Sequence, residues 1–178
     1  MNKLYLTQYS QLPTGKITVT DKSGHVKYHI YGEVGKVNAR LYILDQSGNE
    51  LASILQTATG FFPRFILTTP DHQKIGSIGF SFQFHEVIFI SDLNWLINSF
   101  SLSSQYQVRH FHHLLMSASP DQHLTQVLSI YTNENEAYLV LIAAFLNRLH
   151  LYFNRNQNKW LNLSLRQTAQ VAQYQKRV

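Results

Sequence analysis

The sequence contains one long stretch, residues 137–153 (AYLVLIAAFLNRLHLYF), that would form a helix with apolar side chains on every side. A helix without a polar face has to be buried, either in protein or in lipid. Its uninterrupted apolar part, Ala137 to Leu146, is only ten residues long, whereas a membrane-spanning helix needs about 20. We therefore expect no transmembrane segment and a helix that lies in the core of a domain.

The residues around this stretch suit the two ends of a helix. Asn133 or Asn135 can cap its start, and Glu136 lies three residues after Asn133, as in a capping box. Arg148 and His150 complement the negative C-terminal end of the helix dipole. A second interpretation has Arg148 and His150 at the mouth of a barrel, where they would hold an anion.

The chain before this helix is predicted to be a series of β-strands. Three similar hairpins come first, and their turns contain Asp21, Asp45 and Asp71, which are 24 and 26 residues apart. We predict about twelve strands, at 3–9, 16–21, 25–33, 40–44, 49–55, 64–68, 74–78, 84–90, 93–100, 105–112, 113–118 and 125–132.

A sheet of this size usually curls or closes, and closure removes the exposed edges. The predicted fold is mainly β: a closed antiparallel barrel of about twelve strands around a central buried hydrophobic helix, 137–153. We assign residues 1–154 to this barrel domain. Residues 155–178 form a basic C-terminal tail, for which we leave open a strand, a short helix or a docked appendage.

Charge is distributed unevenly along the chain. All ten acidic residues lie at or before Glu136, whereas residues 137–178 carry six Lys or Arg and no acid, a net charge of +6. A basic segment of this kind can bind anionic lipid, nucleic acid or an acidic protein surface, although a solvated tail is the simpler interpretation.

The sequence lacks the features of secreted proteins and of several enzyme classes. It has no cysteine, which excludes disulfides, zinc–thiolate sites and cysteine catalysis. The N-terminal residues have no apolar block typical of a signal peptide, so we expect a cytoplasmic protein that can associate peripherally with a membrane.

Motifs for catalysis are also missing. The sequence has no G-x-S-x-G, P-loop or G-x-G-x-x-G motif. Six of the ten acids are assigned to turns or to the helix start, and the other four have no suggestive spacing. Gly76 and Gly79 are predicted to mark a bulge or close packing against the helix. We expect neither an enzyme nor a cofactor.

The most distinctive polar cluster is RHFHH, Arg109 to His113. On a strand, His110 and His112 would share a face and could contribute two ligands to a metal ion. A third ligand would have to come from elsewhere, so the simpler interpretation is a half-exposed polar strand. We predict no metal site and keep these two histidines as weak candidates. Nucleic acid is not expected, because no module that binds it is recognisable.

Anions are the ligands that the basic side chains suit best, since the guanidinium fork of arginine matches a phosphate. Strand lysines such as Lys16 and Lys27 are further candidates. The candidates for binding an anion or a lipid headgroup are Arg40, Arg64, Arg109, Arg148, Arg155, Lys159 and Arg166.

The segment LYILDQSGNELASI (41–54), the repeated hairpins and the apolar helix 137–153 resemble the LURP-one-related proteins. These belong to the tubby C-terminal-like group with the phospholipid scramblases, and include uncharacterised bacterial members. The resemblance covers residues 1 to about 153. It implies a twelve-stranded barrel around a helix, and it implies phospholipid or membrane-surface binding without identifying a site.

The leading hypothesis is a non-enzymatic domain that binds anionic phospholipid or a membrane surface. The first alternative is a protein-interaction or scaffold domain. The second is a small-ligand carrier or an enzyme of unknown reaction.

Overall fold

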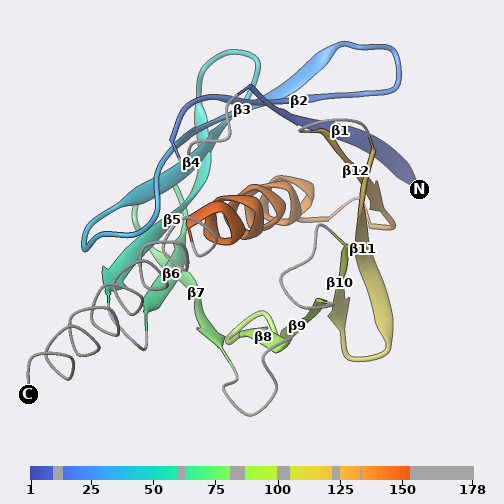
Figure 1. The fold of residues 1–178 in the computed structure, drawn as a ribbon. Coiled ribbons are helices and arrows are strands. Elements are labelled where there is room, and N and C mark those ends of the chain that lie inside the picture. Colours follow the sequence, from blue (N-terminus) through green and yellow to red (C-terminus); the bar gives the residue numbers. More distant parts are fainter. Residues whose placement is uncertain are drawn as a thin grey trace, which may run out of the picture.

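The structure, a computed structural model, describes residues 1–9, 14–59, 63–80, 87–99, 105–121, 125–132 and 134–152, except for the side chains of Phe80 and Ser99. Twelve strands surround a helix over residues 136–152 (Figure 1). The strands are β1 (Asn2–Gln8), β2 (Ile17–Thr20), β3 (Val26–Gly32), β4 (Arg40–Leu44), β5 (Glu50–Ala58), β6 (Arg64–Thr68), β7 (Lys74–Phe80), β8 (Val87–Ile90), β9 (Trp95–Ser99), β10 (Tyr106–His110), β11 (His113–Pro120) and β12 (Thr125–Ile130).

Each strand pairs antiparallel with the next one in the sequence, and the ring closes between the first and the last strand. In that closing pair Asn2 lies opposite Ile130 and Leu6 lies opposite Gln126. The predicted closed barrel is therefore confirmed. Closure leaves none of these twelve strands with an edge open for pairing.

The helix occupies the middle of the barrel, as predicted from its lack of a polar face. Leu139 to Phe145 are all completely buried. They pack against the alternating inward side chains of the strands, including Leu41 and Leu67. Each Leu, Ile, Val or Phe side chain among them stabilises the fold by about 1.5–3 kcal/mol when fully buried.

The turns of the first two hairpins form as their sequences predict. Asp21 Oδ1 accepts a hydrogen bond from the His25 amide at 3.0 Å, and Asp45 Oδ1 accepts one from the Asn49 amide at 2.8 Å. Gly24 and Gly48 take positive φ angles of 81° and 84°. Both turns thus need a short acceptor side chain and, three residues later, a residue that tolerates this backbone.

The prediction that Asp71 plays this part in the third hairpin is wrong. Thr69 takes the place of the aspartate, since its Oγ1 accepts a bond from the Gln73 amide at 3.1 Å. His72 has the positive φ, 61°, in place of glycine. The equivalent residues are therefore Asp21, Asp45 and Thr69, and the structural repeat is 24 residues at both steps.

Gly76 lies close to a neighbouring strand and not to the helix. A Cβ atom added at Gly76 would lie 2.5 Å from the carbonyl oxygen of Ser91 and 3.0 Å from Ile90 Cγ2. The predicted close approach is therefore present, but its partner is β8 and the turn after it. An added side chain would have to push this backbone away.

Glu136 joins the start of the helix to two strands. Its carboxylate accepts hydrogen bonds from Lys27 Nζ and Tyr28 Oη, both at 2.8 Å, and from Asn2 Nδ2 at 3.2 Å. Burial raises the pKa of Glu136, but these bonds and the charge of Lys27 outweigh it and hold the pKa below its ordinary value. This cluster attaches the helix to β1 and β3.

The barrel has two rims, which we name after the helix residues that lie there. The Glu136 rim carries the connections 21–25, 45–49, 69–73, 91–94 and 111–112. The Tyr152 rim carries the connection 33–39 and the ends of β1, β3, β5, β7, β9 and β11. Tyr152 reaches the second rim at Gly35, whose carbonyl oxygen accepts a bond from the tyrosine hydroxyl at 3.3 Å.

Candidate functional site

The two rims differ in charge. Among the described residues the Glu136 rim and the strand ends beside it hold seven acids (Asp21, Asp45, Glu50, Asp71, Asp92, Glu134, Glu136) and five cations (Lys3, Lys22, Lys27, Lys74, Arg109). In the same part of the chain, the Tyr152 rim holds five cations (Lys16, Lys36, Arg40, Arg64, Arg148) and two acids (Glu33, Asp121). The charge is thus separated along the barrel axis, and the Tyr152 rim is the basic one.

Three of these cations form an arc on the basic rim. Arg40 and Arg64 are the first residues of β4 and β6, and Lys16 directly precedes β2. In an antiparallel sheet every second strand starts at the same edge. These three residues therefore lie on one rim, and the backbone of each is about 10 Å from that of the next. We call Lys16, Arg40 and Arg64 the cationic arc.

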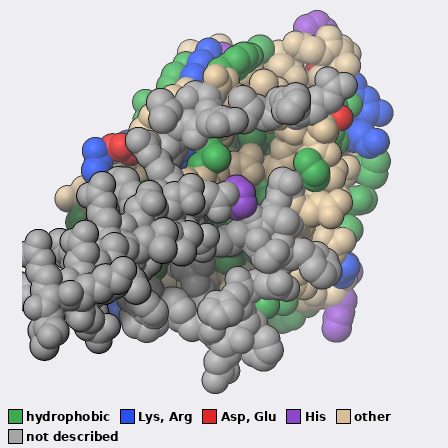
Figure 2. Space-filling model, viewed as in Figure 1, with side chains coloured by type: hydrophobic (Ala, Val, Ile, Leu, Met, Phe, Trp, Pro, Cys, Tyr) green, Lys and Arg blue, Asp and Glu red, His purple; other side chains and the backbone are tan. Residues whose placement is uncertain are grey.

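The arc covers only half of the rim. The remaining strands that start there, β8, β10 and β12, begin with Val87, Tyr106 and Thr125. Figure 2 shows basic side chains around the edge of this face of the molecule. Positions 16, 40 and 64 are spaced by 24 residues, as are 21, 45 and 69, so the hairpin repeat itself places the arc.

Two members of the arc lie against tyrosine rings on the outer face of the barrel. Tyr31 lies opposite Tyr42 in the β3–β4 pair, and their rings stack with centroids 6.0 Å apart. Lys16 Nζ is 5.8 Å from the centroid of the Tyr31 ring, and Arg40 Cζ is 5.8 Å from that of Tyr42. This row orients both cations along the same surface.

The three residues of the cationic arc differ in whether an acidic side chain neutralises their charge. Arg40 Nη2 donates to Glu50 Oε1 at 2.5 Å, so its guanidinium extends along the barrel wall toward the start of β5 and much of its charge is neutralised. Lys16 and Arg64 are exposed and, among the described side chains, form no ion pair. His29 lies near Lys16: burial and, secondly, the lysine charge lower the pKa of its imidazole. Lys16 and Arg64 are therefore the arc cations best placed to meet an anion.

Arg148 is not exposed at the mouth of the barrel. Its side chain is completely buried, and its guanidinium donates to the carbonyl oxygens of Thr14 at 2.8 Å and Gly15 at 2.6 Å. Burial lowers the pKa of Arg148 to about 10, so it remains charged at neutral pH. Its contacts thus attach the helix to the connection between β1 and β2 and do not face an external anion.

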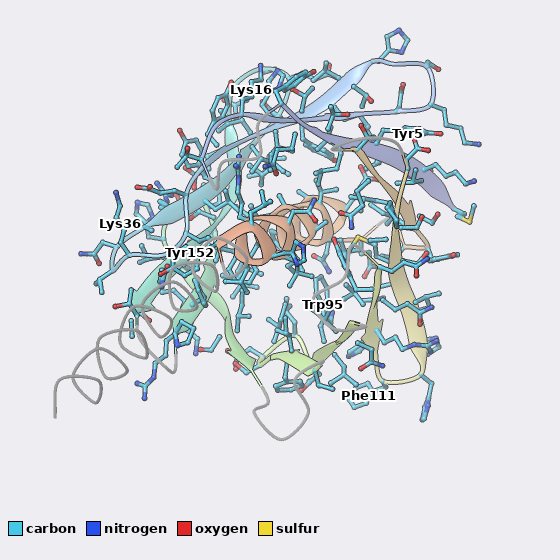
Figure 3. The ribbon with its side chains drawn as sticks, in the orientation of Figure 1. Tyr5, Lys16, Lys36, Trp95, Phe111 and Tyr152 are labelled. Atoms are coloured by element: carbon cyan, nitrogen blue, oxygen red, sulfur yellow. The ribbon has the colours of Figure 1, made fainter. Side chains whose placement is uncertain are left out.

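The structure does not bring Arg109 together with the cationic arc. Arg109 is on β10, six strands from β4 in either direction around the ring, and it lies near the Glu136 rim. Its guanidinium donates to Gln107 Oε1 at 3.2 Å and to the His112 carbonyl at 3.5 Å. In Figure 3 the neighbouring Phe111 lies across the ring from Lys16, Lys36 and Tyr152.

The prediction that His110 and His112 share one face of a strand is wrong. Phe111 and His112 form the turn between β10 and β11, and Phe111 has a positive φ of 51°. His110 instead lies opposite His113. No group of three or more His, Asp or Glu that could hold a metal ion occurs within the described parts of the chain.

The other predicted cations, Arg155, Lys159 and Arg166, lie outside the described residues, as does the whole predicted tail 155–178. The helix nevertheless reaches the Tyr152 rim at its last described residue, and five cations and no acid follow in the sequence. Over the residues that the structure describes, no helix is both long enough and apolar enough to span a bilayer.

The sequence predicted the arc residues one by one as candidates, but not their shared rim. The signal that could have found it is the 24-residue spacing of 16, 40 and 64. Sequence reasoning also missed Lys36, which lies between β3 and β4 on the same rim. It also missed the hydrogen bonds from Glu136 to β1 and β3, because no local sequence pattern relates residues that are more than 100 positions apart.

No protein-family model and no curated protein matches the chain. Among solved structures, the X-ray structure of a protein from Arabidopsis thaliana is similar, with a TM-score of 0.61 and 11% sequence identity. The match covers 83% of this chain and 90% of that one. At this identity the likeness shows a shared fold, and residue roles do not follow from it.

Proposed function

We propose that this protein is a non-enzymatic binding module that attaches to membrane surfaces containing anionic phospholipid. The observation that carries the proposal is the cationic arc, which lies on the rim where the helix ends and where the sequence continues into the basic segment. Arg155, Lys159 and Arg166 of that segment would add to the same attraction. Basic residues near an anionic bilayer contribute about 1 kcal/mol each.

The barrel architecture supports one further part of this proposal. A closed barrel around an apolar helix is the fold that kinship with the LURP-one-related proteins implies, and we propose that kinship. In the same proposal the protein is cytoplasmic and associates peripherally with the membrane.

Co-sedimentation with vesicles tests the proposal. The protein should sediment with phosphatidylcholine–phosphatidylserine vesicles at low salt, less at high salt, and not with phosphatidylcholine alone. The double variant Lys16→Gln/Arg64→Gln should bind about 10- to 30-fold more weakly, since two charges are lost. Equal sedimentation with neutral and anionic vesicles at low salt would overturn the proposal.

A matched control separates the position of the charge from net charge. Lys22→Gln/Lys74→Gln removes the same charge from exposed residues at the Glu136 rim. This variant should bind almost as well as the unchanged protein. Equal weakening of both double variants would show that the arc itself has no special part.

A protein-interaction domain is the second candidate, and one observation favours it. Phe89 and Leu96 are exposed large apolar residues that lie opposite each other on β8 and β9. Leu96 is in turn opposite Arg109. A pull-down experiment tests this candidate. It would be favoured over the first if a stoichiometric protein partner binds the unchanged protein but not Phe89→Ser/Leu96→Ser, and if lipid has no effect.

A further inference from the structure

The connection between β3 and β4, residues 33–39, is a tight turn at the basic rim. The Ala39 amide donates to the Lys36 carbonyl at 3.1 Å. Gly35 and Asn38 have positive φ angles of 111° and 64°. Glycine and asparagine are the residues that adopt this conformation most readily, so the sequence itself favours the turn.

Three hydrogen bonds with one residue of β5, Gln56, hold the turn in place. The Asn38 amide donates to the Gln56 carbonyl and the Gln56 amide to the Ala39 carbonyl, both at 2.9 Å. The Gly35 amide donates to Gln56 Oε1 at 2.7 Å. The conformation of the turn is therefore set by β5 before any ligand arrives.

The end of the helix packs against the same turn. The Tyr152 hydroxyl donates to the Gly35 carbonyl, and a Cβ atom added at Gly35 would lie 2.2 Å from the tyrosine ring. Only glycine leaves room for this contact. The turn is thus fixed to the central helix as well as to the barrel wall.

The side chains that this turn presents outward are one cation and one apolar residue. Lys36 is 67% exposed and pairs with Glu33, while Val37 is 51% exposed at the tip. Val34 and Ala39 on either side are buried. Arg40 of the cationic arc begins the next strand. An apolar residue is therefore exposed to water at the tip of a fixed turn, beside two cations that are each paired with an acid, Lys36 with Glu33 and Arg40 with Glu50.

We infer that this turn inserts Val37 into the headgroup region of an anionic bilayer while Lys16 and Arg64 of the cationic arc contact the lipid phosphates. The inference rests on the function proposed above and adds an orientation to it: the Tyr152 rim faces the membrane and the Glu136 rim faces away. The occupant is a lipid surface because the exposed apolar atoms are few and the described residues of the Tyr152 rim hold more cations than acids. Because β5 and the helix hold the turn in place, insertion needs little reordering of the turn.

Fluorescence from single labelled cysteines tests the orientation directly. The chain has no cysteine of its own, so Val37→Cys and Phe111→Cys each provide one site, at opposite rims, for an environment-sensitive dye. With phosphatidylcholine–phosphatidylserine vesicles, the dye at position 37 should shift to the blue and brighten, and the dye at 111 should not. A response at 111 instead of 37 would overturn the inference.

Sedimentation of the same labelled proteins separates this inference from the proposed function. If both variants sediment with anionic vesicles but neither dye responds, insertion is wrong and the proposed function stands. If neither variant sediments, both ideas fail.

A second pair of variants tests the contribution of the apolar side chain without a dye. Val37→Asn should weaken binding to the anionic vesicles about tenfold, since a buried valine contributes roughly that factor. Phe111→Asn, also at an exposed turn, should leave binding unchanged. Circular dichroism should show that both variants keep the fold. Equal binding by Val37→Asn and the unchanged protein would contradict insertion.

Discussion

Phe145 of the helix and Phe65 of β6 meet edge to face inside the barrel, with ring centroids 4.8 Å apart and planes inclined by 69°. Both rings are buried, Phe145 completely. The pair connects the middle of the helix to the barrel wall, at a distance in sequence that no local pattern predicts.

Replacement of both phenylalanines should reveal a coupling between them. Phe65→Leu and Phe145→Leu should each destabilise the protein, and the double variant should lose about 0.5–1.5 kcal/mol less than their sum, because the edge-to-face contact is lost only once. Urea denaturation of all four proteins measures this. Additive losses would mean that the two rings contribute burial alone.

A polar residue in the middle of the helix should unfold the domain. Leu141 is completely buried, so Leu141→Asn leaves an amide without its water contacts and removes apolar packing, at a cost of about 3–5 kcal/mol. This is a large part of the stability of an ordinary domain. Thermal melting should show the loss, whereas Asn147→Gln, at a half-buried polar position of the same helix, should melt close to the unchanged protein. A Leu141→Asn protein of unchanged stability would show that the helix is not the core.

Arg148 should matter for stability and not for lipid binding. Arg148→Met removes the two hydrogen bonds to Thr14 and Gly15, and we expect a loss of about 3 kcal/mol in the free energy of unfolding. Arg148→Lys keeps the charge but not the forked geometry, and should be intermediate. Denaturation in urea gives these values, and co-sedimentation of the folded Arg148→Lys protein should be unchanged. Full stability of Arg148→Met would contradict the assigned role.

The Glu136 cluster should make the stability depend on pH in the acid range. Its folded pKa is lowered, so its contribution is complete above the unfolded value, about 4.3, and is lost as the pH falls through the folded value. At neutral pH Glu136→Gln should be about 1–2 kcal/mol less stable than the unchanged protein. This difference should shrink as the pH is lowered from 5 to 3.

Urea midpoints recorded across that range provide the measurement. Glu134→Gln is the control, because Glu134 is an exposed acid at the same helix start, and it should show little difference at any pH. If the difference in the free energy of unfolding between Glu136→Gln and the unchanged protein stays constant down to low pH, the ionised carboxylate is not its cause.

Much of the fold could be predicted from local pattern. Every predicted strand corresponds to an observed one, and β4 (Arg40–Leu44) and β6 (Arg64–Thr68) have the predicted bounds. The reason is that alternation, turn residues and apolar runs act over a few neighbouring positions. Prediction failed where a local pattern was ambiguous. Phe111 and His112 continue a strand-like alternation but form a turn, and in the third hairpin Thr69 takes the role that was predicted for Asp71.

The sequence by itself thus determined the strands, most turns and the burial of the helix, because these depend on short-range periodicity and on the cost of exposing apolar surface. Only the tertiary structure decided which cations act together. Closure of the ring placed Lys16, Arg40 and Arg64 on one rim and Arg109 on the other, and the packing of the helix buried Arg148 against Thr14 and Gly15. Those outcomes depend on contacts between residues far apart in the chain, which no local pattern specifies.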